Sequence, residues 1–213
     1  MEDIKNILVI GVGLMGNGIA QISLMAGYNT TLVDISQEII DKAVVSIEDG
    51  LNKLESKGVL KAAEILARMK TSLDLASAVK DADLIIEAVV EDMDVKKKVF
   101  KTCDENAPSH AIIASNTSTM SITKMATATK RPDKCIGMHF FNPAPLMRLI
   151  EVIAGEKTSD KSMQIGVKIS KSLPCLRGDR YVAKVLKDRP GFIVNRLNAP
   201  GGIYMNYLLD TCL

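Results

Sequence analysis

Short apolar runs alternate with longer amphipathic stretches along most of this chain. The run Ile7–Ile10 is apolar throughout, as is typical of a strand buried on both faces, and a helical pattern ending at Gly27 follows it. Similar runs predict strands at residues 30–33, 84–86, 111–114, 136–138, 149–153 and 181–186. Helical spacing predicts helices at residues 36–58, 60–69, 94–106, 121–128 and 159–171. This alternation predicts an α/β fold with a doubly wound, mainly parallel sheet.

Two parts of the chain depart from simple alternation. The helices at 36–58 and 60–69 follow one another without a strand between them, so we expect this helical pair to project from the sheet. A last helix is expected to begin near Phe192 and to be interrupted at Ala199-Pro200-Gly201-Gly202, because proline and glycine propagate a helix poorly. The apolar stretch 203–209 then has little chain of its own to pack against.

Composition and charge exclude several classes of protein. The 213 residues include 27 Lys and Arg against 25 Asp and Glu, so nucleic acid and anionic membranes are not expected as partners. With 47% apolar residues the chain is expected to form an ordinary globular core. No signal peptide or membrane span is expected. The cysteines are more than thirty residues apart, which disfavours a metal site or disulfide framework and favours a cytoplasmic location (Cys103, Cys135, Cys175, Cys212).

A glycine-rich turn lies between the first predicted strand and its helix. Gly11-Val12-Gly13-Leu14-Met15-Gly16 has the G-x-G-x-x-G spacing that lets a pyrophosphate approach a helix N-terminus in Rossmann-type folds. Asp34 ends the second strand, where its carboxylate would accept hydrogen bonds from ribose hydroxyls and repel a 2′-phosphate, favouring NAD over NADP. A glycine turn without a ligand and a methyltransferase-type Rossmann variant remain as alternatives.

His139 and Glu151 are candidates for acid–base chemistry. His139 ends a predicted strand beside two phenylalanines, and Glu151 interrupts the apolar run Leu149–Ile153. If the two strands are neighbours, Glu151 would fix one imidazole nitrogen and leave the other to act as a general base. The alternatives are a histidine packed in the core and a glutamate that faces water on an edge strand.

Polar residues also follow two other predicted strands, on the side of the sheet where ligands bind. Ser115–Thr119 could contact substrate or nicotinamide, although capping of the next helix explains these hydroxyls equally well. Glu87 and Glu91 follow another strand, and Lys96-Lys97-Lys98 are interpreted as a solvated helix face. No motif typical of serine hydrolases, P-loop proteins or zinc proteases is present.

Five blocks of this sequence, in order, resemble signature blocks of the 3-hydroxyacyl-CoA dehydrogenases, with the bacterial 3-hydroxybutyryl-CoA dehydrogenases as the most similar subgroup. The blocks are Ile10–Gln21, Ile86–Glu91, Ala114–Ser118, His139–Pro145 and Pro190–Leu197. The resemblance extends over nearly all residues from Ile4 to Leu197.

The resemblance implies a role for individual residues. His139 matches the family's catalytic base and Glu151 its partner, and Ser118 and Asn195 match residues that hold the substrate oxygen. Lys57 matches a residue that contacts the CoA moiety. The positions matching NAD contacts are Gly11, Gly13, Leu14, Met15, Gly16, Asp34, Glu91, Lys96, Ser118 and Asn142.

The implied reaction is oxidation of a short-chain L-3-hydroxyacyl-CoA, such as 3-hydroxybutyryl-CoA, to the 3-ketoacyl-CoA, or its reverse, with NAD and without a metal. Residues 1–188 would form the NAD-binding domain, and 189–213 would be a remnant of a helical domain that closes the substrate cleft and forms the family's homodimer. We therefore expect a C-terminally truncated chain in which that domain and its dimer interface are largely missing. An NAD-binding remnant with little or no turnover is the alternative to an active dehydrogenase.

Overall fold

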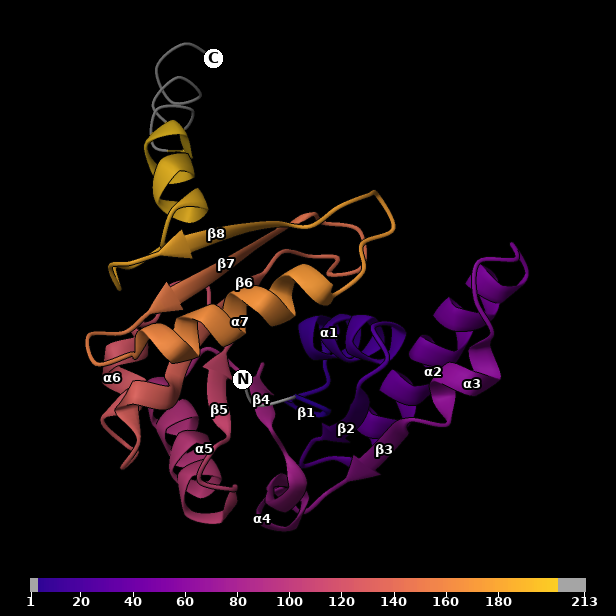
Figure 1. The fold of residues 1–213 in the computed structure, drawn as a ribbon, viewed down its shortest axis with the longest axis horizontal. Coiled ribbons are helices and arrows are strands. Elements are labelled where there is room, and N and C mark those ends of the chain that lie inside the picture. Colours follow the sequence, from indigo (N-terminus) through magenta and orange to yellow (C-terminus); the bar gives the residue numbers. More distant parts are fainter. Residues whose placement is uncertain (1–3, 203–213) are drawn as a thin grey trace, which may run out of the picture.

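The computed structural model describes residues 4–202, which are organised around one eight-stranded sheet (Figure 1). In chain order the strands are β1 (Asn6–Ile10), β2 (Asn29–Val33), β3 (Met69–Ser72), β4 (Leu84–Glu87), β5 (Ile112–Ser115), β6 (Cys135–Phe140), β7 (Leu149–Ala154) and β8 (Tyr181–Val185). They lie side by side as β3-β2-β1-β4-β5-β6-β7-β8, all parallel to their neighbours except the antiparallel pair β6 and β7. The strand order reverses direction at β1, so the carboxyl ends of β1 and β4 flank the position where α/β sheets bind ligands.

Helices cover both faces of the sheet. They are α1 (Leu14–Met25), α2 (Gln37–Glu55), α3 (Ala62–Leu66), α4 (Leu75–Ala78), α5 (Met93–Asn106), α6 (Ile122–Ala126) and α7 (Asp160–Ser172), with short 3-10 turns at Val79–Asp81 and Pro132–Lys134. Apolar side chains of α1, α2, α3 and α7 join one buried cluster, and those of α5 and α6 join a second. The fold is therefore a doubly wound, mainly parallel sheet, as the sequence predicts.

Alternation along β1 explains why this strand has no polar face. Ile7 and Val9 belong to the first cluster, whereas Leu8 and Ile10 belong to the second. All four side chains are at most 4% exposed. A strand in the middle of a parallel sheet is covered on both faces, so its sequence is apolar at every position.

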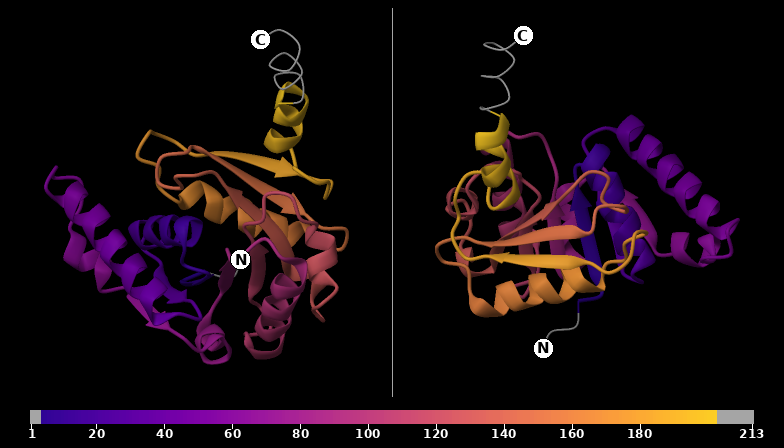
Figure 2. Two further views of the ribbon diagram at one scale, coloured as in Figure 1. Left: turned by 180° about the vertical axis from the view of Figure 1, so that it is seen from behind. Right: turned by 90° about the horizontal axis from the view of Figure 1, so that it is seen from above.

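The edge of the sheet at β3 differs from the prediction. The sequence predicts a helix over 60–69, but α3 ends at Leu66 and Met69 already belongs to β3. The sequence Met-Lys-Thr-Ser has no buried residue and no apolar alternation, and the strand forms by main-chain pairing with β2. The short helix α4 also has no buried residue and was not predicted. The projecting helical pair is confirmed, because α2 and α3 extend beyond the β3 edge (Figures 1 and 2).

The chain leaves β8 in a turn and enters a helix at residues 194–202. The predicted interruption at Ala199-Pro200-Gly201-Gly202 was wrong within the described residues, because all four positions are helical. Proline has a helical φ and lacks only its own N–H, so it can continue a helix at the cost of that hydrogen bond. The stretch 203–209 and Cys212 lie outside the described residues, and the predicted domain boundary at residue 188 stays a prediction. Within residues 4–202, no helix combines the length and apolar character needed to cross a bilayer.

Candidate active site

The side chains of His139 and Glu151 form a buried pair at the junction of β6 and β7. Antiparallel pairing of these strands places the two residues directly opposite each other. His139 Nδ1 lies 2.7 Å from Glu151 Oε2, and the glutamate is 0% exposed. The alternative of a glutamate facing water on an edge strand was wrong, because β8 covers the outer side of β7.

Glu151 also accepts hydrogen bonds from the beginning of the last described helix. Its Oε1 accepts from the main-chain N–H groups of Ile193 and Val194, both at 3.0 Å. Burial alone would raise the pKa of Glu151, but the hydrogen bonds from His139, Val194 and Ile193 outweigh burial and lower it below its ordinary value. Glu151 is therefore an ionised acceptor, so His139 Nδ1 donates to it and Nε2 is the proton acceptor of the neutral ring.

Two aromatic rings contact the imidazole. The ring centroids of Phe141 and Phe192 lie 4.4 and 5.7 Å from that of His139. His139 is only 5% exposed. A histidine sheltered from water and held by a carboxylate is suited to general acid–base chemistry.

The glycine turn lies at the carboxyl end of β1. Its first and third glycines are required because any side chain there would clash with main-chain atoms of the protein. Gly11 has φ +81°, and a Cβ there would lie 2.7 Å from the Ala88 carbonyl oxygen. A Cβ on Gly16 would lie 1.9 Å from the carbonyl oxygen of Gly11, so α1 can approach β1 only with glycine at this position.

Gly13 leaves space for a dinucleotide, and Asp34 provides a carboxylate that can bind one. Gly13 precedes α1, and a Cβ there would meet nothing within 4 Å. Asp34 Oδ2 accepts from the Val12 N–H at 3.0 Å, and its Oδ1 accepts from the Ile35 N–H at 2.8 Å. Oδ1 also accepts from the Ser36 N–H at 3.4 Å, so Oδ2 is the oxygen that retains a further acceptor position for a ribose hydroxyl. An open backbone at a helix N-terminus beside a carboxylate fits the pyrophosphate and adenosine ribose of NAD.

Alanine at the two glycines should separate stability from cofactor binding. Gly16→Ala is expected to lower the free energy of unfolding by about 1–3 kcal/mol, because the new methyl group meets a main-chain oxygen. Gly13→Ala is expected to cost at most about 1 kcal/mol as a helix N-cap change. It should nevertheless weaken NADH binding at least about tenfold, because the methyl group fills the space where the pyrophosphate approaches.

Urea unfolding and NADH calorimetry of both variants check this expectation. Gly13→Ala with wild-type NADH affinity would show that the dinucleotide does not approach this turn. Gly16→Ala with wild-type stability would show that α1 can move away from β1 without cost.

A second buried charge network links β4, α5 and the loop after β5. Lys96 is 1% exposed, and its Nζ lies 2.7 Å from Glu87 Oε1 and 3.0 Å from Glu91 Oε2. Glu87 also accepts from Ser115 Oγ at 2.6 Å. The interpretation of Lys96 as part of a solvated helix face was therefore wrong. Helical spacing was the available signal, because Lys96 shares the buried face of α5 with Phe100 and Cys103, but its partners lie on other elements.

Glu91 carries this network to the surface beside Ser118. Its Oε1 accepts from Thr117 Oγ1 at 2.8 Å and from the Ser118 N–H at 2.9 Å. Burial acts to raise the pKa of Glu91, but the Ser118 N–H, the charge of Lys96 and the Thr117 hydroxyl together lower it. Glu91 is therefore a charged, half-buried group at the carboxyl edge of the sheet.

The other predicted site residues make fewer contacts with the two networks described above. Asn195 Nδ2 lies 3.4 Å from the Ser118 carbonyl oxygen, so the last helix and the loop after β5 meet. Asn142 is exposed after β6, and Lys57 is exposed just beyond the end of α2 on the projecting helical pair. Leu14 is 77% exposed and Met15 is partly buried at the start of α1.

Sequence reasoning missed the role of Asn116, which links the end of β5 to the end of β6. Its Oδ1 accepts from the Phe140 N–H at 3.0 Å, next to His139. Its position in a polar run after a strand was the available signal, but the partner lies on β6.

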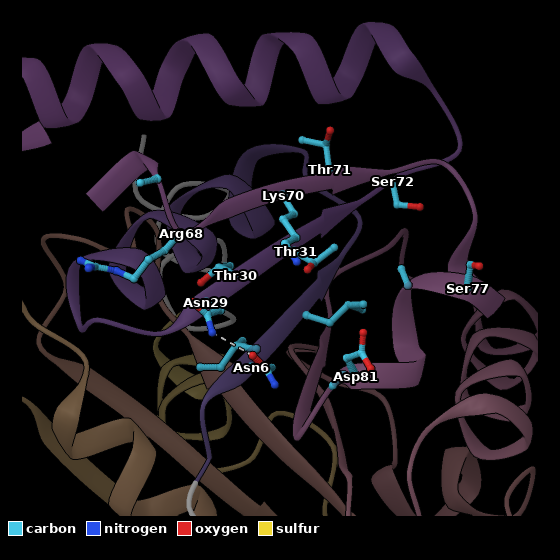
Figure 3. Close-up of a pocket in the computed structure, with 15 residues that line it drawn as sticks. Asn6, Asn29, Thr30, Thr31, Arg68, Lys70, Thr71, Ser72, Ser77 and Asp81 are labelled. Atoms are coloured by element: carbon cyan, nitrogen blue, oxygen red, sulfur yellow. Dashed lines mark hydrogen bonds between the residues drawn. The ribbon is translucent and has the colours of Figure 1, made fainter. Parts of the chain in front are cut away.

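A separate polar hollow of about 380 Å³ lies on the sheet at β1, β2 and β3, beside α4 (Figure 3). Polar side chains from three strands line it, including Asn6, Asn29, Thr31, Lys70 and Ser72. None of the predicted site residues is among its lining residues, so this hollow is distinct from the site around His139.

A doubly wound sheet with the G-x-G-x-x-G turn before α1 and an acidic residue after β2 defines a Rossmann-type dinucleotide-binding domain. Residues 6–175 match the family model described as "3-hydroxyacyl-CoA dehydrogenase, NAD binding domain". The chain belongs to this family and carries its NAD-binding domain. The methyltransferase-type alternative is thereby removed.

Similar proteins bear names from the same family. The chain is 43% identical over 205 residues to a mitochondrial hydroxyacyl-coenzyme A dehydrogenase of Sus scrofa, covering 92% of this chain and 63% of the relative. It is 45% identical over 195 residues to a 3-hydroxybutyryl-CoA dehydrogenase of Clostridioides difficile, covering 90% and 67%. The crystal structure of (S)-3-hydroxybutyryl-CoA dehydrogenase from Ralstonia eutropha has a TM-score of 0.86 and 42% identity, covering 93% of this chain and 69% of that one. The chain thus spans 63% of the length of the Sus scrofa relative.

Proposed function

We propose that this chain catalyses the reversible oxidation of an L-3-hydroxyacyl-CoA to the 3-ketoacyl-CoA, with a short acyl chain such as 3-hydroxybutyryl. The observation that carries the proposal is the buried His139–Glu151 pair, in a chain that has the family's NAD-binding domain. Burying a carboxylate beside an imidazole is costly, and acid–base chemistry at this position would account for that cost.

In the oxidative direction, His139 Nε2 would take the proton of the substrate hydroxyl. Glu151 would hold Nδ1–H and stabilise the imidazolium that forms, and its lowered pKa supports that role. NAD, when bound, supplies the hydride acceptor. In the reductive direction the same imidazolium would return its proton to the 3-keto oxygen.

The remaining predicted residues take supporting roles in this proposal. Ser118 and Asn195 would hold the substrate oxygen, which agrees with the contact between their two segments. Asn142 and Glu91 would contact the cofactor, and Lys57 the CoA moiety. Lys96 would act through Glu91, because Glu87, Glu91 and the Val89 carbonyl already take its ammonium group.

The test measures turnover and binding side by side. Acetoacetyl-CoA should be reduced with loss of NADH absorbance, and free acetoacetate is the matched control because it lacks the CoA handle. Calorimetry with NADH should give saturable binding to the same preparation. NADH binding without turnover of acetoacetyl-CoA would overturn the proposal and select an NAD-binding chain without dehydrogenase activity.

A further inference from the structure

Two carboxylates hold the turn between β8 and the last described helix: Asp188 at its beginning and Glu151 of β7 at its end. At its beginning, Asp188 Oδ2 accepts from Ser121 Oγ at 2.6 Å and from the Thr123 N–H at 2.7 Å, at the start of α6. At its end, the N–H groups of Ile193 and Val194 are bound by Glu151. The turn therefore connects α6 to the partner of His139.

Between these two anchors the main chain adopts a conformation that it would not adopt freely. Gly191 has φ +77°, and Phe192 has φ +48°, in the left-handed region that side chains other than glycine rarely occupy. Such a conformation persists only where the surroundings hold it. Phe192 is 4% exposed and packs in a small buried cluster with Ile122 of α6 and Ile153 of β7.

Asp188 itself is held at a cost. Its second carboxylate oxygen, Oδ1, is buried and has no hydrogen-bond partner. A buried acceptor without a partner is unfavourable, and the two short hydrogen bonds that Oδ2 accepts from the start of α6 offset that cost.

We propose that Asp188 is a positioning residue for the His139–Glu151 pair. By fixing the turn to the first residues of α6, it presents the N–H groups of Ile193 and Val194 to Glu151 and the ring of Phe192 to His139. Its catalytic meaning rests on the function proposed above, but its effect on His139 can be measured without substrate.

The chain offers an unusually direct measurement, because it has only two histidines, His139 and His110. The proton resonances of both imidazoles can be followed against pH by NMR in the full chain. Asp188→Ala should move the His139 titration to higher pH, because the Ile193 and Val194 amides no longer compete for the charge of Glu151 and Phe192 no longer keeps water from the imidazolium. The amides of Ile193 and Val194 should exchange about tenfold faster with solvent.

The matched control is Asp83→Asn. Asp83 directly precedes β4, at the amino ends of the parallel strands and away from His139. Asp83 also accepts two main-chain N–H bonds, from Lys5 and Asn6, and it contacts His110 at 2.8 Å. This variant should shift the titration of His110 and leave that of His139 unchanged. Asp188→Asn keeps an acceptor oxygen, so it should restore the His139 titration close to that of the wild type.

A His139 titration that is unchanged or moved to lower pH in Asp188→Ala would overturn the proposal. Faster exchange confined to residues 121–126 would overturn it too, since it would show that Asp188 serves only the helix α6. If Asp188→Ala does not fold, Ser121→Ala decides in its place: it removes one of the two bonds to Asp188 and should shift His139 upward by a smaller amount. A chain without dehydrogenase activity gives the same readout, so the failure of either proposal is visible separately.

Discussion

Replacing His139 by glutamine is expected to lower kcat for acetoacetyl-CoA reduction by roughly 10² to 10⁴. Glutamine can still donate a hydrogen bond to Glu151, which accepts from Nδ1 at 2.7 Å in the native chain. It has no group that exchanges a proton near neutral pH, so acid–base chemistry at this position is lost. The affinity for NADH should stay within about twofold, because the variant leaves the glycine turn and Asp34 untouched.

His110→Gln is the matched control for this variant. His110 is the other histidine of the chain and pairs with Asp83 at 2.8 Å, outside the candidate site. Steady-state rates and NADH calorimetry on both variants give the comparison. A His139→Gln enzyme that retains the wild-type rate would rule out His139 as the acid–base group.

Replacing Lys96 by methionine is expected to lower the free energy of unfolding by about 3–5 kcal/mol. The variant leaves the carboxylate of Glu87, which is 0% exposed, without its counter-charge. The methylene groups of lysine are retained in shape by methionine, so the loss reports the uncompensated charge and not a cavity. Urea unfolding at neutral pH measures it.

Two further variants make the interpretation specific. Lys98→Met changes an exposed neighbour in the same run of lysines and should stay within about 0.5 kcal/mol of the wild type. Adding Glu87→Gln to Lys96→Met should recover part of the loss, because the buried site then holds no charge. Equal stability of Lys96→Met and Lys98→Met would contradict the buried network.

The central strands and the glycine turn could be read from the sequence because their causes are local. β1 is apolar at every position since both of its faces are covered, and Gly11, Gly13 and Gly16 have the spacing that the turn before α1 requires. β3 could not be read in this way. Its last three residues are polar, none of its residues is buried, and only pairing with β2 makes them a strand.

Individual candidate residues could be selected from the sequence, but most of the contacts among them could not. His139 and Glu151 were singled out because a histidine and a glutamate interrupt apolar strands. The sequence did not reveal that the N–H groups of Ile193 and Val194 also bind Glu151. It also did not reveal that Asp188, in the turn before them, binds the start of α6. These contacts join residues more than forty positions apart, and no periodicity connects them.

The sequence by itself determined the class of fold, the glycine turn at the carboxyl end of β1 and the types of residue available for chemistry. Only the tertiary structure decided which charges are paired: His139 with Glu151 across β6 and β7, and Lys96 with Glu87 between α5 and β4. The physical reason is that apolar periodicity acts over a few residues, whereas the partner of a buried charge depends on strand order and register. Strand order and register are set by packing of the whole core, so a run of three lysines can contain two surface residues and one buried ammonium group.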